Sequence, residues 1–235
     1  MYNLQEIFSI ILFNRCIKCD ELFETYCDKC IEAALNIDTT CFVCENSTDN
    51  FSTHKLCLNN KRNLYPVQSI YLTEYNSDLR KIIYGYKKYG ASRYIIHKLL
   101  YAAFKDIKFQ YRPDIIILVD SHKNILSRNI EPSLQSLLLQ QLVKKFGYIQ
   151  SVKPFAIDNF IRAQKGLGLN DRYQNIKNKI SLKDDFDIKL LNDKNILVID
   201  DILTSGATLS WIIKLLSKSN YKTLSSLHFA RELIV

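Results

Sequence analysis

A strand, an acidic pair, a loop and a helix follow one another near the C-terminus, and this order constrains the fold more than any other feature. In residues 195–199, Asn195 precedes an apolar and mainly β-branched run, which is typical of a strand buried in a parallel sheet. Asp200 and Asp201 come directly after this run, and a loop of small and hydroxyl-bearing residues follows at 204–208. The spacing of apolar residues then predicts a helix at 207–216. We therefore expect two carboxylates and a polar loop at one edge of a parallel sheet.

The chain before this segment alternates between helical and strand patterns. Apolar residues at helical spacing predict helices at 78–88, 91–106 and 132–146, and a short β-branched run predicts a strand at 114–119. A last strand is expected at 222–229. Such alternation with short connections predicts an α/β fold with a mainly parallel sheet. Ligands of such folds bind at the carboxyl ends of the strands. The loops after Val119 and Ile199 are therefore expected on the same rim.

The loop at 204–208 has the chemistry of a phosphate site. Gly206 allows the backbone to approach a ligand closely, and hydroxyl-bearing side chains surround it. The helix that follows points its unpaired amides and the positive end of its dipole toward the loop. Asp200 and Asp201 would accept hydrogen bonds from sugar hydroxyls or hold Mg²⁺ through water. An ordinary helix cap is the alternative interpretation of the loop, but a cap needs no acidic pair.

All seven cysteines lie before residue 58, in paired spacing. The predicted metal ligands are Cys16, Cys19, Cys27 and Cys30 in a first group, and Cys41, Cys44, His54 and Cys57 in a second. The odd count and the lack of an export signal argue against a disulfide framework, so we predict structural zinc. Three alternatives stay open: His54 is a surface histidine, the cysteine pairs combine differently, or the second group holds no metal.

Composition sets the domain boundaries and the classes of partner. The chain has 235 residues, 47% of them hydrophobic, which is enough for a core of ordinary size. The change from a cysteine-rich stretch to longer apolar segments predicts a zinc-binding module at 1–62 and a second domain at 63–235. A net charge of +8 is compatible with phosphate-bearing partners. It is equally compatible with a Lys- and Asn-rich composition in which the basic charge has no functional role. The apolar run at 7–13 is too short to span a bilayer, so we expect a cytoplasmic protein that is not integral to a membrane.

The segment from Val198 to Thr208 resembles the phosphoribosyl pyrophosphate (PRPP) motif of type I phosphoribosyltransferases. The resemblance implies that Asp200 and Asp201 contact the ribose hydroxyls, as the catalytic pair of a transferase would. It also implies that the 5′-phosphate is held by the loop residues Thr204, Ser205, Gly206, Ala207 and Thr208. Mg²⁺ would accompany PRPP.

A cysteine-knuckle module followed by a phosphoribosyltransferase-like domain is the arrangement of the ComF family of competence proteins. Residues 86–90 look like that family's Lys-Tyr-x-Gly segment, and residues 164–175 match its Gln…Leu…Arg…Asn stretch. Ala230 and Arg231 fit its closing strand. The resemblance implies a type I phosphoribosyltransferase-like fold and an accessory role in DNA uptake. The expected partners are PRPP, single-stranded DNA and the uptake machinery at the inner membrane.

The sequence departs from that family at the loop after the first core strand. In place of a Pro-Val-Pro-like loop it has Asp120, Ser121, His122 and Lys123. Lys123 and Ser121 could still bind pyrophosphate, whereas Asp120 would repel it unless Mg²⁺ lay between them. Arg128 is all that remains of the family's Arg-Gly-Phe-Asn-Gln stretch. These departures favour PRPP binding over efficient transfer.

Basic residues outside the loop are candidates for contact with phosphate or nucleic acid, namely Lys87, Lys88, Arg128, Arg162 and Arg172. The last two belong to a polar segment at 160–190, which is either a flap that clamps phosphates or an ordinary solvated loop. The first two lie on a predicted helix with interleaved tyrosines, a pattern that suits single-stranded DNA but also a solvated helix face with tyrosines packed inward.

Three functions remain compatible with the sequence. The first is a competence accessory protein that binds PRPP and single-stranded DNA. The second is an active phosphoribosyltransferase of nucleobase metabolism, for which the sequence shows no recognisable acceptor pocket. The third is an interaction subunit whose loop holds any phosphate. Whether the chain is an enzyme is left open by the sequence.

Overall fold

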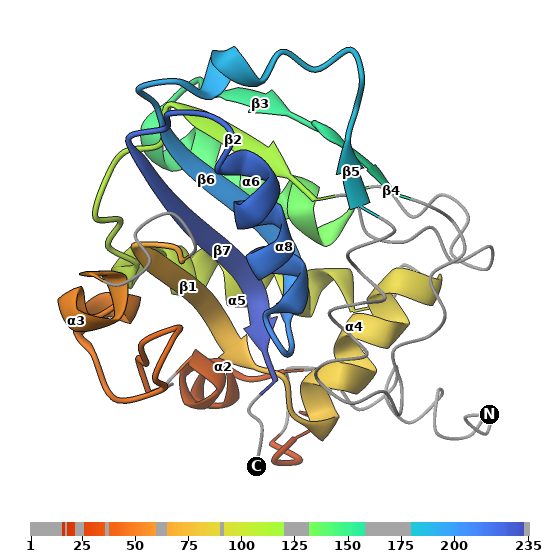
Figure 1. The fold of residues 1–235 in the computed structure, drawn as a ribbon. Helices are drawn as coiled ribbons and strands as arrows, with labels where there is room; N and C mark the ends of the chain where they lie inside the picture. Colours follow the sequence, from red (N-terminus) through yellow and green to blue (C-terminus); the bar gives the residue numbers. More distant parts are fainter. Residues whose placement is uncertain are drawn as a thin grey trace.

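A five-stranded parallel sheet forms the centre of the protein (Figure 1). The computed structural model describes residues 16, 18–21, 26–35, 38–59, 65–89, 92–119, 132–157 and 180–232. Its strands are β1 (Gln68–Glu74), β2 (Ile115–Leu118), β3 (Gln150–Val152), β6 (Asn195–Leu203) and β7 (Thr223–Arg231). Their order across the sheet is β1-β7-β6-β2-β3, and every neighbouring pair is parallel. The predicted α/β class with a mainly parallel sheet is therefore confirmed.

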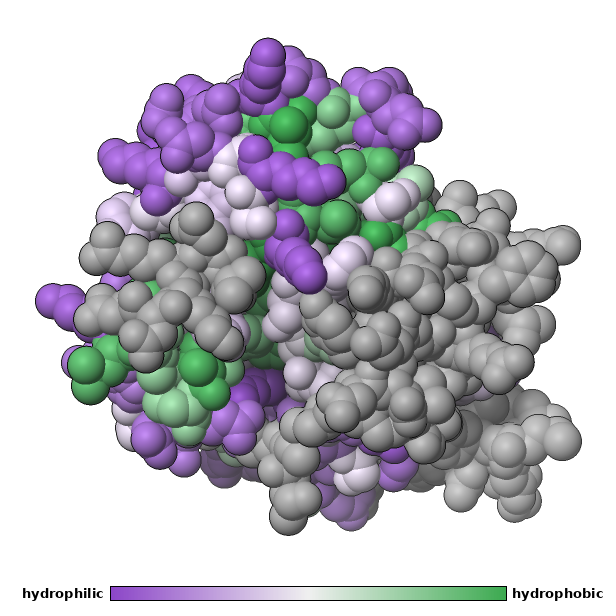
Figure 2. Space-filling model, in the orientation of Figure 1, coloured by the Kyte–Doolittle hydropathy of each residue, from purple (hydrophilic) through white to green (hydrophobic). Residues whose placement is uncertain are grey.

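Helices cover both faces of the sheet. One face carries α4 (Ser77–Tyr89), α5 (Arg93–Asp106) and α6 (Leu134–Phe146). The other carries α8 (Ala207–Leu216), with a two-stranded antiparallel sheet of β4 (Phe155–Ile157) and β5 (Ile180–Leu182) and the short helix η2 (Ile188–Leu191). Figure 2 shows the α8 face, where apolar residues (green) lie between hydrophilic ones (purple).

The central strand β6 is buried on both faces. Leu197 and Ile199 pack into the core on the α4 and α5 side, whereas Ile196 and Val198 pack into the core on the α8 side. A strand in this position needs apolar side chains at every residue rather than at alternate ones. This requirement explains the continuous apolar run that predicted the strand.

The strand order reverses between β2 and β6, because β3 lies on one side of β2 and β7 lies on the opposite side of β6. β2 and β6 are parallel neighbours, with Leu118 opposite Ile199, yet α6 follows β2 on one face and α8 follows β6 on the other. Strands that lead to opposite faces leave a crevice at their carboxyl ends, where α/β folds bind ligands. The prediction that Val119 and Ile199 lead to the same rim is confirmed. β6 runs on to Leu203, beyond the predicted end at 199.

The cysteine-rich part packs against the sheet through α2 (Asp28–Leu35) and η1 (Asp49–Phe51), and it also contains α3 (Lys55–Asn59). Tyr26 and Ile31 are buried in the same core as the residues of α5. An ion pair joins Lys98 Nζ of α5 to Asp28 Oδ1 of α2 at 2.9 Å. The cysteine-rich part thus shares a core with the sheet, and the domain boundary between residues 62 and 63 stays a prediction.

The predicted helices at 78–88, 91–106, 132–146 and 207–216 are confirmed with small shifts at their ends. Two strands of the sheet, β1 and β3, were not predicted. Among the residues that the structure describes, no helix combines the length and the apolar character that a membrane crossing requires.

Candidate functional site

The acidic pair lies at the carboxyl end of β6, inside the strand rather than after it. The amide of Asp201 donates a hydrogen bond to Asp200 Oδ1 at 2.8 Å, and the amide of Ile202 donates to Asp201 Oδ1 at 2.8 Å. Each carboxylate is thereby held by the amide of the residue that follows it. Alternation along the strand turns Asp200 toward the α8 face and Asp201 toward α4.

Lys87 of α4 brings a cation to this pair. Its Nζ donates a hydrogen bond to Asp201 Oδ2, and the two side chains are 38% and 17% exposed. The neighbouring Tyr86 is buried, and its hydroxyl donates to the carbonyl of Pro132, which fixes this end of α4. The structure therefore places Lys87 in the site. Lys88 turns away from it, and its Nζ donates to Tyr84 Oη at 2.8 Å.

The two carboxyls titrate in opposite directions. Burial and the charge of Asp201 raise the pKa of Asp200 well above its ordinary value. Burial also acts on Asp201, but the charge of Lys87 and its hydrogen bond outweigh it and lower the pKa of Asp201. Of the two carboxyls, Asp200 therefore holds a proton more readily and Asp201 carries the negative charge more readily. Such a pair offers both a donor and an acceptor to the hydroxyls of a sugar.

The loop after β6 has the geometry of an anion site. Gly206 is the N-cap of α8 and has a left-handed backbone with φ of 70°, and no side chain caps the helix. The first hydrogen bond within the helix runs from the amide of Ser210 to the carbonyl of Gly206 at 2.9 Å. The amides of residues 207–209 come before this bond and therefore have no acceptor within the helix. The hydroxyl-bearing residues Thr204, Ser205 and Thr208 are all partly exposed. These features favour a phosphate loop over an ordinary helix cap.

Several predicted site residues lie outside the described part of the chain. They are the pyrophosphate-loop residues Asp120, Ser121, His122 and Lys123, and the basic residues Arg128, Arg162 and Arg172. Their roles stay predictions.

His228 was missed by the sequence analysis and lies directly beside the acidic pair. It stands opposite Asp200 on β6 and opposite Tyr71 on β1, and it is fully buried. Neither of its ring nitrogens has a hydrogen-bond partner among the described residues. Burial lowers its pKa to about 3, and the charge of Asp201 only partly opposes this effect. A histidine inside a predicted strand gives no signal of its own, and only the register of the strands reveals its neighbour.

The first cysteine group is arranged for a tetrahedral metal ion. The sulfurs of Cys16, Cys19, Cys27 and Cys30 all lie within 4.8 Å of one another. Cys16 Sγ is 3.7 Å from Cys30 Sγ, and Cys19 Sγ is 3.5 Å from Cys27 Sγ. Tetrahedral bonds of about 2.3 Å to a central ion imply sulfur separations of about 3.8 Å, whereas a disulfide needs about 2 Å. The distances thus fit a shared ion and not a disulfide.

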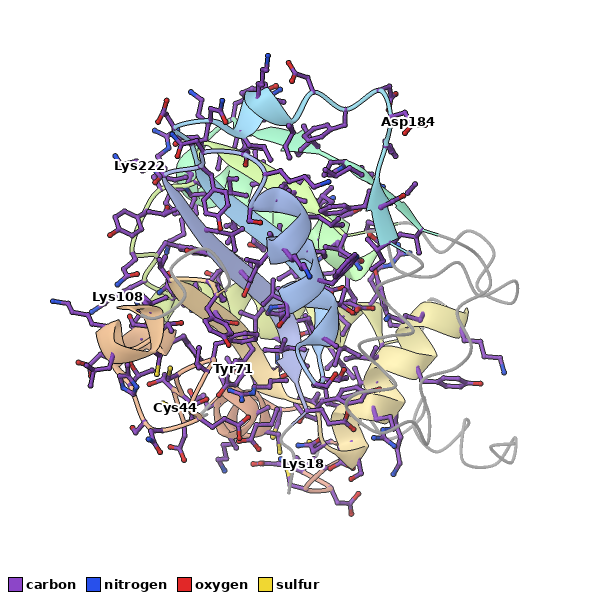
Figure 3. All side chains as sticks on the ribbon, viewed as in Figure 1. Lys18, Cys44, Tyr71, Lys108, Asp184 and Lys222 are labelled. Atoms are coloured by element: carbon purple, nitrogen blue, oxygen red, sulfur yellow. The ribbon has the colours of Figure 1, made fainter. Side chains whose placement is uncertain are left out.

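The second group adds a histidine to three cysteines (Figure 3, where Cys44 is labelled). The ligand atoms of Cys41, Cys44, His54 and Cys57 lie within 4.8 Å of one another. His54 Nδ1 is 3.3 Å from Cys44 Sγ, and His54 Nε2 is 3.2 Å from the carbonyl oxygen of Ser47. A carbonyl oxygen only accepts, so Nε2 carries the proton and Nδ1 is left for a metal. The structure thus supports His54 as a ligand, and both groups can hold a metal.

The charges of the thiols also favour a cation. Burial opposes ionisation of Cys16, but backbone amides, that of Cys27 first, lower its pKa to about 6. In the same way, amides led by that of Cys44 lower the pKa of Cys41 to about 7. Burial and the neighbouring sulfurs instead raise the pKa of Cys57 to about 11. Without a cation only some of the thiols in a group can ionise, whereas a central divalent ion allows all of them to do so.

We expect the buried His228 to make the protein acid-sensitive. Its folded pKa of about 3 lies below the ordinary value of 6.5, so below pH 6.5 the unfolded chain takes up a proton that the folded chain does not. Its contribution lowers the free energy of unfolding by about 2 kcal/mol between pH 7 and pH 5. Urea denaturation at both pH values should show a smaller loss for His228→Phe than for the wild type. Equal losses in the two proteins would contradict this account.

The comparison of sequences gives one relative. No family model matches the chain. The chain is similar to the competence protein F of Haemophilus influenzae, with 29% identity over 138 residues. The match covers 52% of this chain and 53% of the relative, so the chain spans about half the length of the curated relative it matches.

The fold has distant likenesses among solved structures. One is a purine phosphoribosyltransferase from Pyrococcus horikoshii, with 17% identity and a TM-score of 0.33 over 71% of this chain and 82% of that one. Another is a hypoxanthine phosphoribosyltransferase from Staphylococcus aureus, with 16% identity and a TM-score of 0.34 over 66% and 71%. Likenesses this distant carry no argument about ligands. The sequence match, the parallel sheet flanked by helices and the Cys₄ group at the N-terminus together fit a protein of ComF type.

Proposed function

We propose that this chain binds a 5-phosphoribosyl ligand, PRPP with Mg²⁺, at the end of β6. One observation carries the proposal. Two carboxylates held by backbone amides are followed at once by a hydroxyl-rich loop and a helix whose N-terminus has no side-chain cap. This arrangement lies at the point where the strand order reverses, which is where α/β folds bind ligands.

Each part of the site has a role in this proposal. Asp200 and Asp201 bind the ribose hydroxyls, one as a proton donor and one as an acceptor. The loop at 204–208 binds the 5′-phosphate through amides and hydroxyls. Lys87, which pairs with Asp201, places a positive charge where a pyrophosphate would lie beside the ribose. Bound Mg²⁺ would neutralise the pyrophosphate, and active transfer to an acceptor is a separate property that pyrophosphate release would reveal.

The similarity to a competence protein F supports a role in the uptake of DNA, and we propose single-stranded DNA as the second ligand. Exposed tyrosines with a lysine four residues later occur on both α4 and α5. Lys88 Nζ lies 5.2 Å from the ring centre of Tyr84, and Lys105 Nζ lies 4.6 Å from that of Tyr101. Such pairs offer a ring for a base and a cation for a phosphate. A protein in this role works in the cytoplasm, at the inner face of the membrane.

We also propose that both cysteine groups hold zinc as a structural ion. All four protein ligands are present in each group, so no position is left open for catalysis. The exclusively sulfur and imidazole ligands suit zinc better than Mg²⁺ or Ca²⁺.

Titration calorimetry tests the PRPP site. We expect PRPP with Mg²⁺ to bind to the wild type, and Asp201→Asn to weaken binding by about tenfold or more because a charged acceptor of hydrogen bonds is lost. Lys87→Met should weaken binding as well, whereas Lys88→Met, which changes the next residue along the same helix, should not. Absence of binding to the zinc-loaded, folded wild type would refute the proposal.

Electrophoretic shift assays test the DNA surface. Single-stranded DNA should bind at low salt, and Tyr101→Ala combined with Lys105→Ala should weaken it and reduce the slope of log affinity against log salt by about 1. Tyr148→Ala is the matched control. Tyr148 is an exposed tyrosine as well, at 87%, but neither Lys88 nor Lys105 lies over its ring in the described part of the chain. If the wild type fails to bind at low salt, the role in DNA handling is wrong.

Metal analysis tests the two cysteine groups. Purified protein should contain about two zinc ions per chain, because each group has a full set of four ligands. Cys19→Ser and Cys44→Ser should each reduce the content by about one ion, and both substituted cysteines are exposed. A zinc content near one in the wild type would restrict the proposal to a single group.

A further inference from the structure

The second cysteine group touches the phosphate loop. A Cβ atom placed on Gly206 would lie 3.0 Å from Phe42 Cζ and 3.2 Å from Phe42 Cε2. Phe42 follows the metal ligand Cys41 directly. The ring therefore rests against the backbone of the residue that caps α8, and it leaves no room for a side chain there.

A second contact joins the same metal-binding turn to the start of the loop. Arg231, at the end of β7, is buried, and its guanidinium donates to Thr40 Oγ1 at 2.5 Å and to Glu45 Oε1 at 2.8 Å. Arg231 stands opposite Leu203 in the sheet, and the amide of Glu232 donates to the carbonyl of Leu203 at 2.8 Å. Leu203 is the residue immediately before the phosphate loop.

The platform under this turn is the edge strand β1. The hydroxyl of Tyr71 donates to the carbonyl of Asp38 at 2.7 Å, and the guanidinium of Arg231 lies 5.4 Å from the centre of the Tyr71 ring (Figure 3). Tyr71 and Arg231 thus both tie residues 38–45 to the sheet.

Two of the candidate metal ligands, Cys41 and Cys44, lie in this turn. Residues 41–45 form a closed turn in which the amide of Glu45 donates to the carbonyl of Cys41 at 3.0 Å. Glu45 has a left-handed backbone with φ of 59°, a conformation that costs a residue other than glycine about 1 kcal/mol. A metal bound by Cys41 and Cys44 would hold this turn closed, and Phe42 and Glu45 would then be kept in place.

We propose that Phe42 is a positioning residue for the phosphate loop, and that the metal in the second cysteine group supports phosphoribosyl binding through it. This inference rests on the proposed PRPP site. The first cysteine group packs with α2 and α5 instead, so the inference assigns the two groups different roles.

Two substitutions at Phe42 test whether its side chain positions the phosphate loop or only stabilises the fold. Phe42→Ala in zinc-loaded protein should weaken binding of PRPP with Mg²⁺ by between about 2-fold and 30-fold, the usual size of such couplings. Phe42→Leu should restore much of it, because its side chain still fills the space beside Gly206. Val43→Ala is the matched control, since Val43 belongs to the same turn but is not among the atoms nearest to Gly206. Zinc content and the urea midpoint are measured for each variant.

A double-mutant cycle tests the contact itself. Gly206→Ala alone should weaken PRPP binding strongly, because its methyl group meets the Phe42 ring and its backbone is left-handed. Adding Phe42→Ala removes the collision but not the backbone strain, so the loss for the double variant should be smaller than the sum of the single losses. Additive losses would overturn the inference.

Hydrogen exchange keeps the inference testable without any ligand. Amides of residues 204–208 should exchange faster in Phe42→Ala than in the wild type or in Val43→Ala, with zinc bound in all three. If the wild type fails to bind PRPP but this difference is present, the proposed function is wrong and the positioning role stands. Equal exchange in the three proteins would refute the positioning role whatever the PRPP result.

Discussion

Two adjacent carboxylates on a strand that is buried on both faces would repel each other and lose their hydration, and the rest of the site is organised around that constraint. Lys87 reaches across from α4 to pair with Asp201, and the pKa of Asp200 is raised while that of Asp201 is lowered. For Lys87 to stay there, the end of α4 must be fixed, and the buried Tyr86 does this through Pro132. One helix, packed on the sheet by its apolar face, thus supplies the positive charge that pairs with the end of one strand.

The parts of the structure that could be predicted are those whose sequence pattern records their own burial. β6 was predicted because a strand covered on both faces must be apolar throughout, and its end was placed too early because the acidic pair interrupts that run. β1 was missed although nearly all of it is buried, because Gln68, Ser69 and Thr73 are polar. Their partners, such as Ser226 Oγ donating to Ser69 Oγ at 2.8 Å, lie far away in the sequence.

The candidate site divides in the same way. The acidic pair and the loop were found because they are contiguous, and the cysteine groups because metal ligands have fixed spacings. Three features of the site depend on residues that are distant in the chain. They are the contact of Lys87 with Asp201, the burial of His228 and the packing of Phe42 on Gly206. No local pattern records such contacts, because they follow from strand order and register, which become known only with the fold.

The contact of Arg231 with Thr40 and Glu45, beside the second cysteine group, affects the order of folding. Arg231 is 191 residues away from Thr40 and 186 away from Glu45, and β1 pairs with β7 rather than with a neighbour in sequence. During synthesis the cysteines leave the ribosome long before the strand that completes their platform. The knuckle can capture its metal early, but it docks only after β7 has been made. Contacts of such long range form slowly, so the edge of β1 stays open in the nascent chain and is the place where association with chaperones or with other chains would begin.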